Sequence, residues 1–195
     1  MKLKVFFLLF AVWFFFVRES SVTYGEGVVA PMEPLQTKVT DRPPFSFKAY
    51  TVVPLAALEI EARVLSIEHY RFDRGAKLSP VDLVLGWGRM SDEKVLDAID
   101  ISQSGRWYHW ASDSLPIPRR EIETHSANMH IIPADDVIEK LLGKVRRGDI
   151  LHLKGWLIRA EGADGSRWVS SLTRTDTGAH ACEVLFVREA ERVYR

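Results

Sequence analysis

Alternation of apolar and polar side chains predicts a strand-rich chain from about residue 47 onward. Apolar residues at the even positions of 58–64 alternate with charged residues at the odd positions, which is the period of a half-buried strand. Further strands are predicted at 81–87, at 121–132 (ending before Pro133), at 150–160, at 167–173 and at 182–187. Residues 106–110 are predicted as a strand or an ordered loop.

Two short helices interrupt this pattern. Ser91 is a suitable N-cap for a helix over 92–99, and Asp135 and Gly143 bound a clearer helix between them. Residues 162–165 form a glycine-rich hairpin turn. The pattern therefore predicts a mainly β domain of the α+β class with one or two short helices. A small Greek-key barrel resembling the OB fold, placed after an N-terminal hydrophobic helix, is favoured, and an open α+β sandwich is the alternative.

The N-terminus has the pattern of an export signal. Residues 5–17 carry no polar side chain, come after Lys2 and Lys4, and end at Arg18. The run spans about 20 Å as a helix, which is short for a bilayer, yet no clear cleavage site is found beyond it. Residues 1–18 are thus a signal anchor or a signal peptide.

The leader and the adjoining segment predict location and domain boundaries. Proline and glycine between 19 and 46 predict an extended linker, and residues 47–195 form a single soluble domain. The positive charges at the N-terminus place the domain outside the cytoplasm. We expect it at the inner membrane facing the periplasm, or secreted to the periplasm if the leader is cleaved.

Composition narrows the classes of function. The chain has 26 basic and 26 acidic residues, so it lacks the positive charge typical of nucleic-acid binding. Its single cysteine, Cys182, excludes an internal disulfide. The sequence has no phosphate-binding loop, dinucleotide fingerprint or paired-cysteine zinc motif, so no cofactor or metal is expected.

Cys182 is the main candidate for chemistry. His180 lies two residues before it, on the same face of a predicted strand, and a neighbouring imidazole favours the nucleophilic thiolate. His125 and His130 are five apart, which puts them on opposite faces of an ideal strand and argues against a shared metal, although either could approach the thiol in space. The alternative is a buried structural cysteine, because no third, orienting group is apparent.

Other residues are candidates for binding a polar ligand. The segment 170–178 gathers hydroxyl and carboxylate groups, including Ser171 and Asp176, around Arg174. The alternative is a long turn in which these groups bond to their own backbone. Trp107, in an aromatic segment, and Asn128 are further candidates. Asn128 precedes a methionine where type I signal peptidases have their serine, so that chemistry is not expected.

Three segments carry a resemblance to a family of uncharacterised bacterial envelope proteins. They are residues 79–88 (SPVDLVLGWG), 117–133 (IPRREIETHSANMHIIP), and 170–178 (SSLTRTDTG) continued by 181–183 (ACE). The resemblance covers about 58–190. It implies a location in the envelope and a common domain, without an activity.

The sequence favours a membrane-tethered extracytoplasmic domain that binds an envelope protein or a polar ligand. The alternative is a hydrolase or acyl-transfer enzyme that uses Cys182 and a histidine. The membrane is expected as a partner through residues 1–18.

Overall fold

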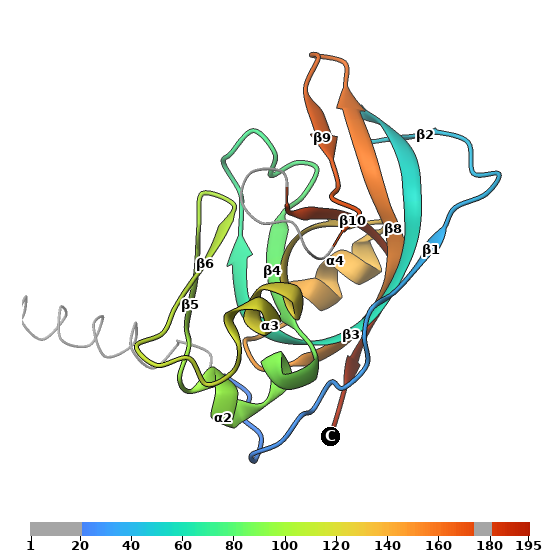
Figure 1. Ribbon diagram of the computed structural model, residues 1–195. Helices are drawn as coiled ribbons and strands as arrows, with labels where there is room; N and C mark the ends of the chain where they lie inside the picture. Colours follow the sequence, from blue (N-terminus) through green and yellow to red (C-terminus); the bar gives the residue numbers. More distant parts are fainter. Residues whose placement is uncertain (1–20, 174–180) are drawn as a thin grey trace, which may run out of the picture.

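The computed structural model describes residues 21–173 and 181–195 (Figure 1). The prediction of a mainly β protein with short helices is confirmed. The elements, in chain order, are β1 (Leu35–Lys38), β2 (Phe45–Phe47), β3 (Tyr50–His69), β4 (Val81–Gly86), η1 (Gly88–Ser91), α2 (Glu93–Leu96), β5 (Asp100–Ser104), β6 (Trp107–Ala111), α3 (Arg119–Thr124), β7 (Ser126–Pro133), α4 (Asp136–Leu142), β8 (Ile150–Gly162), β9 (Arg167–Val169) and β10 (Glu183–Val193). The predicted N-terminal helix lies outside the described residues.

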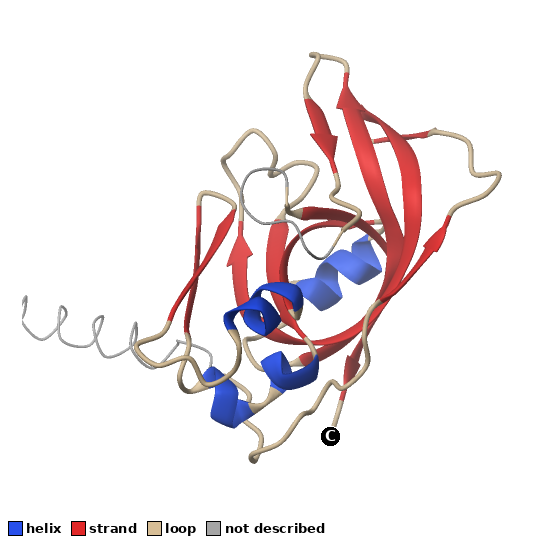
Figure 2. Ribbon diagram, viewed as in Figure 1, coloured by secondary structure: helices blue, strands red, loops and turns tan. Residues whose placement is uncertain are grey.

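The strand pairings form a circuit that returns to its starting strand. β3 pairs antiparallel with β4, β4 with β7, and β10 with β8, whereas β7 and β10 are parallel. β8 then pairs antiparallel with β3 along most of its length. The pairing register of β3, which has 20 residues, shifts near Ala56 and Ser66, and such bulges bend a strand. We call β3, β4, β7, β10 and β8 the strand ring; its curvature is visible in Figure 2.

The main hydrophobic core consists of the alternate residues of these strands that face one another. Leu58 and Ile60 of β3 pack there with Leu83 of β4. Ile138 and Leu142 of α4 belong to the same cluster, so one face of this helix closes the core. Each such leucine or isoleucine stabilises the fold by about 1.5–3 kcal/mol through burial. The predicted cap of α4 is confirmed, because the Asp135 carboxylate accepts from two amides of its first turn.

The segment between β4 and β7 packs on the outer side of the strand ring. It contains η1, α2, the β5–β6 hairpin and α3 (Figure 1). Val84 of β4 and Leu65 of β3 contact this layer in a second cluster, which includes Met90 and Ile122. The hairpin is thereby held over β4 and β7.

Several predicted boundaries are wrong. Residues 121–132 are not one strand, because α3 occupies the first part and β7 begins at Ser126. Arg119 and Glu123 form an ion pair one helical turn apart, which favours a helix here. Ile122 is the only buried side chain of α3, so one apolar residue anchors this helix to the domain. The helix predicted over 92–99 is only α2, and its cap is Asp92 rather than Ser91.

Strand lengths near the C-terminus also differ from the prediction. The strand predicted over 167–173 ends at Val169, and the last strand extends to Val193 instead of stopping at 187. Antiparallel pairing with β8 extends β10 through charged residues that carry little apolar signal.

Several described parts of the predicted linker contact the domain. β1 and β2 both pair with β3. Residues 21–30, here called the strap, run beside α2, where the amides of Gly27 and Ala30 donate to the side chains of Asp92 and Ser91. Ala30 in turn accepts from the Gly88 amide.

Candidate functional site

The register of three neighbouring strands brings polar side chains to one patch. Asp82 of β4 lies directly opposite His130 of β7, and His130 lies opposite Val184 of β10. Side chains alternate between faces along a strand, so Asn128 and Cys182, each two residues from one of these positions, share their face. The intervening Met129 points into the main core. The patch therefore lies on the outer face of the strand ring.

Asp82 links His130 to an arginine. One carboxylate oxygen of Asp82 is 2.9 Å from His130 Nδ1, and the other is 3.0 Å from Arg106 Nη1. Asp82 is fully buried. Arg106 also binds Asp73 with Nε and Nη2 and stacks 3.9 Å from the Tyr70 ring centre. The Arg106 guanidinium therefore holds the buried Asp82 carboxylate beside the imidazole of His130.

The β5–β6 turn positions Arg106. Gly105 and Arg106 are its two central residues, and both have positive φ, as a two-residue hairpin of type I′ requires. The hydroxyl of Tyr70 accepts from the Arg106 amide, which fixes the backbone at this point. The hairpin thus directs the guanidinium of Arg106 toward Asp82 at the start of β4.

Cys182 completes a row of three groups. Its side chain is partly exposed just before β10, and the Asn128 amide donates to its sulfur at 3.6 Å. Burial alone would lower the pKa of the His130 imidazole. The neighbouring Asp82 carboxylate and Cys182 sulfur outweigh burial and raise that pKa to about 9. His130 is therefore a cation at neutral pH, with Nδ1 2.9 Å from the carboxylate of Asp82.

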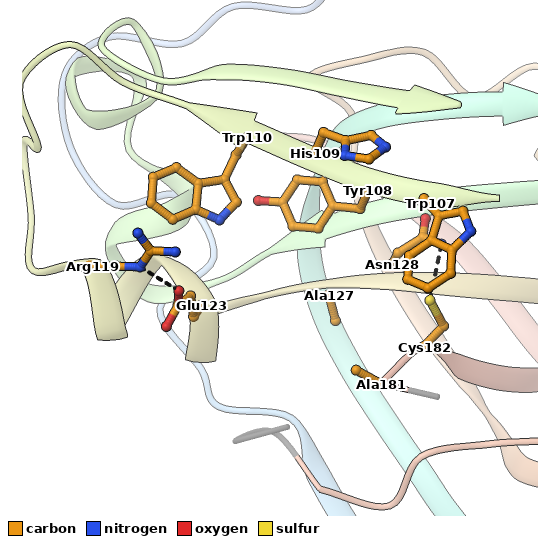
Figure 3. A pocket seen from close by; sticks show the side chains of 10 residues that line it. All are labelled: Trp107, Tyr108, His109, Trp110, Arg119, Glu123, Ala127, Asn128, Ala181 and Cys182. Atoms are coloured by element: carbon orange, nitrogen blue, oxygen red, sulfur yellow. Dashed lines mark hydrogen bonds and ion pairs between the residues drawn. The ribbon is translucent and has the colours of Figure 1, made fainter. Parts of the chain in front are cut away.

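Two cavities meet at Cys182. The first, of about 310 Å³, extends along the aromatic strand β6 toward Arg119 and Glu123, as Figure 3 shows. The second, of about 240 Å³, is bounded by Arg106, His130 and Trp168. Trp107 lines both cavities and is 47% exposed. The sulfur therefore has space for a substrate on either side.

Four sequence candidates converge on this patch, one of them Trp107 on the cavity walls, whereas His125 lies elsewhere. Cys182, His130 and Asn128 are brought together by the pairing of β7 with β10. His125 instead ends α3 and faces Glu33, with Nε2 2.9 Å from the carboxylate. The prediction that His125 and His130 lie on opposite faces of one strand fails because His125 is not in β7.

The ligand-loop candidates are only partly described. The Ser171 hydroxyl bonds to the backbone of Thr173, as the turn interpretation expects. Arg174, Asp176 and His180 lie outside the described residues. In the aromatic segment, which forms a strand, side chains alternate, with Trp107 and His109 exposed and Tyr108 and Trp110 packed on the second cluster.

Sequence reasoning missed Asp82 and Arg106. The signal for Asp82 was present, because it is the only charged residue within a wholly buried strand, and such a carboxylate needs a partner. Asp82, His130 and Cys182 fall in the three segments that carry the family resemblance. Nothing in the sequence distinguishes Arg106 from other turn residues.

Comparison with known proteins assigns no family to this chain. Searches of protein-family models, curated proteins and solved structures found no match. Over residues 21–173 and 181–195, no helix is long and apolar enough to cross a membrane. Within that same part of the chain, no group of three or more His, Cys, Asp or Glu side chains is arranged to hold a metal ion.

Proposed function

We propose that this protein is a thiol enzyme, a hydrolase or acyl-transfer enzyme in which Cys182 is the nucleophile. The observation that carries the proposal is the row Asp82–His130–Cys182, in which a buried carboxylate lies 2.9 Å from an imidazole that neighbours a partly exposed thiol. The sequence favoured a binding domain because an orienting third group was missing, and Asp82 supplies that group.

In this proposal the imidazolium of His130 stabilises the thiolate of Cys182. The thiolate attacks a carbonyl carbon, and His130 donates its Nε2 proton to the leaving group as the carbon–leaving group bond breaks. A water or acceptor alcohol or amine then attacks the thioester, its proton passes to His130, and the carbon–sulfur bond breaks. Asp82 keeps the ring in one orientation throughout.

We also propose that the strand ring is a small Greek-key barrel of the OB type. Its support is the circuit of pairings, with one parallel pair between β7 and β10 and α4 inserted between β7 and β8. In this arrangement the candidate site lies on the second and third strands and beside the connection between the fourth and fifth. OB folds bind their ligands at that region, which is an argument by analogy with the fold.

Binding without chemistry is the second candidate function. The first cavity is lined by Trp107, Tyr108 and Trp110, which offer flat apolar surfaces to a ligand. For either function, we propose that residues 1–18 hold the domain on the periplasmic side of the inner membrane or direct its secretion there. The apolar leader and the family resemblance support this location.

The proposed enzyme is tested by the alkylation rate of Cys182 with iodoacetamide at pH 7. We expect His130→Gln to slow alkylation about 10- to 100-fold, because the thiolate loses its cationic neighbour. The matched control is His125→Gln, which removes a histidine outside the row and should leave the rate unchanged. Equal rates in the wild type and His130→Gln would contradict the proposal, and circular dichroism checks that each variant is folded.

A further inference from the structure

Asn128 has an amide whose orientation is fixed by three partners. Its Nδ2 donates to the Arg106 carbonyl oxygen at 3.1 Å and to the Cys182 sulfur at 3.6 Å. Its Oδ1 accepts from Gln103 Nε2 at 2.8 Å. A carbonyl oxygen can only accept, so the NH2 group must be on the side of Arg106 and Cys182. The side chain is 4% exposed and is held without rotational freedom.

We propose that Asn128 is the oxyanion donor of the Cys182 site, and therefore a catalytic residue for substrates with an ester, thioester or amide carbonyl. This inference rests on the proposed function. Asn128 lines the first cavity together with Cys182 and Trp107, so the residue borders space that a substrate can occupy. Figure 3 shows the three side chains grouped at one end of that cavity.

The position of the amide suits the tetrahedral intermediate. When the Cys182 thiolate bonds to the carbonyl carbon, the carbon–oxygen π bond opens and its electron pair becomes the oxyanion. That oxygen lies one bond beyond the carbon attached to sulfur. A donor in contact with the sulfur can come within about 3 Å of the developing charge when the carbonyl oxygen is on the Asn128 side of the sulfur, which is the geometry that this inference requires. When the intermediate collapses, the electron pair re-forms the carbonyl and the leaving group takes the proton of His130.

The competing explanation is that Asn128 only braces the β5–β6 hairpin. Its bonds to Arg106 and Gln103 both go to that hairpin. If Asn128 only supports the hairpin, replacing it would shift the position of the Cys182 thiol and so affect every reaction of that thiol. Oxyanion donation affects only reactions that pass through a tetrahedral carbon, and this difference defines the experiment.

The test compares two reactions of the same thiol in the full chain. Acylation is monitored with p-nitrophenyl acetate, with Cys182→Ser subtracted as background, and alkylation is monitored with iodoacetamide, which forms no oxyanion. We expect Asn128→Ala to lower the acylation rate by about 100- to 1,000-fold and to change alkylation less than about threefold. The matched control is Gln103→Ala, which removes a partner of the same amide and keeps the donor. It should change acylation less than about fivefold.

Each contrary outcome has a distinct meaning. Parallel losses of acylation and alkylation in Asn128→Ala would assign the residue to bracing and overturn the inference. Equal acylation in the wild type and Asn128→Ala would also overturn it, while leaving the proposed function intact. A wild-type thiol that alkylates but forms no acyl-enzyme would overturn both.

Discussion

At the scale of single residues, the site is organised around one buried carboxylate. Asp82 is shared between His130 and Arg106, so its negative charge is compensated from both sides. Removing either partner would leave a charge in a water-excluded position, which costs several kcal/mol. The same carboxylate gives His130 its charge at neutral pH. Asp82 therefore contributes both to the stability of the patch and to the protonation state of His130.

The raised pKa of His130 predicts that stability depends on pH. The imidazole has a pKa of about 9 in the folded chain and about 6.5 when unfolded. Its contribution is therefore complete below about pH 6.5 and is lost as the pH rises through about 9. We expect the free energy of unfolding to fall by about 3 kcal/mol over this window.

Urea unfolding between about pH 6 and pH 10 measures this dependence. His130→Gln should remove most of the slope, whereas His125→Gln should keep it. A slope that is unchanged in His130→Gln would show that another group causes it. His152 is the relevant comparison, because hydrogen bonds with Glu191 and Glu59 outweigh burial and raise its pKa too.

At the scale of elements, two layers fix the site from different directions. The pairing of β4, β7 and β10 sets the order of Asp82, His130 and Cys182. The β5–β6 hairpin adds the cavity wall and the guanidinium of Arg106. η1 and α2 form the base of the insertion that carries this hairpin, and the strap bonds to this base. A change in the strap therefore loosens the support of the insertion.

Arg63 connects the strap to α2 through a buried ion pair and a ring contact. It is buried, pairs with Glu93 at 2.6 Å, and stacks on Tyr24 of the strap. Glu93 also accepts from the Tyr24 amide. We expect Arg63→Met to lower the free energy of unfolding by about 2–3 kcal/mol, because Glu93 is left partly buried without its cation.

The measurement is urea unfolding together with amide hydrogen exchange over residues 21–30, which should speed up in Arg63→Met. Lys94→Met is the matched control, since its pair with Glu26 is largely exposed and should change stability by less than about 0.5 kcal/mol. Equal effects of the two substitutions would contradict a structural role for the Arg63 pair.

At the scale of the whole molecule, the proposed location and the proposed chemistry support each other. A thiol enzyme on the periplasmic side would meet carbonyl substrates of the envelope. The chain has a single cysteine, so Cys182 has no partner for an internal disulfide in an oxidising compartment. The proposed role of Cys182 as a nucleophile beside His130 explains why an unpaired thiol is present in such a compartment.

The location is tested with an alkaline phosphatase fused to the C-terminus. We expect phosphatase activity in the full chain and its loss when residues 1–18 are deleted, because the enzyme is active only after export. Mass analysis of the mature N-terminus separates an anchor, which retains Met1, from a cleaved signal. Phosphatase activity that does not depend on residues 1–18 would contradict the proposed role of the leader.

Local sequence patterns were enough to predict much of the secondary structure and to single out several candidate site residues. The alternation over 58–64 predicted part of β3, and the cap at Asp135 predicted α4. Cys182, His130, Asn128 and Trp107 were recognisable as candidates by residue type. The boundaries of α3 and β10 were missed, because one buried side chain and a pairing partner decided them.

Only the tertiary structure decided which candidates lie together. Alternation fixes the face of a strand on which a side chain lies, but not its neighbour across the sheet, which depends on strand order and register. Asp82, His130 and Cys182 meet because β7 pairs with β4 on one side and with β10 on the other. His125 lies only five residues from His130 yet belongs to a helix end that faces Glu33. Proximity along the chain gave no guide to proximity in space, because the pairings connect distant segments.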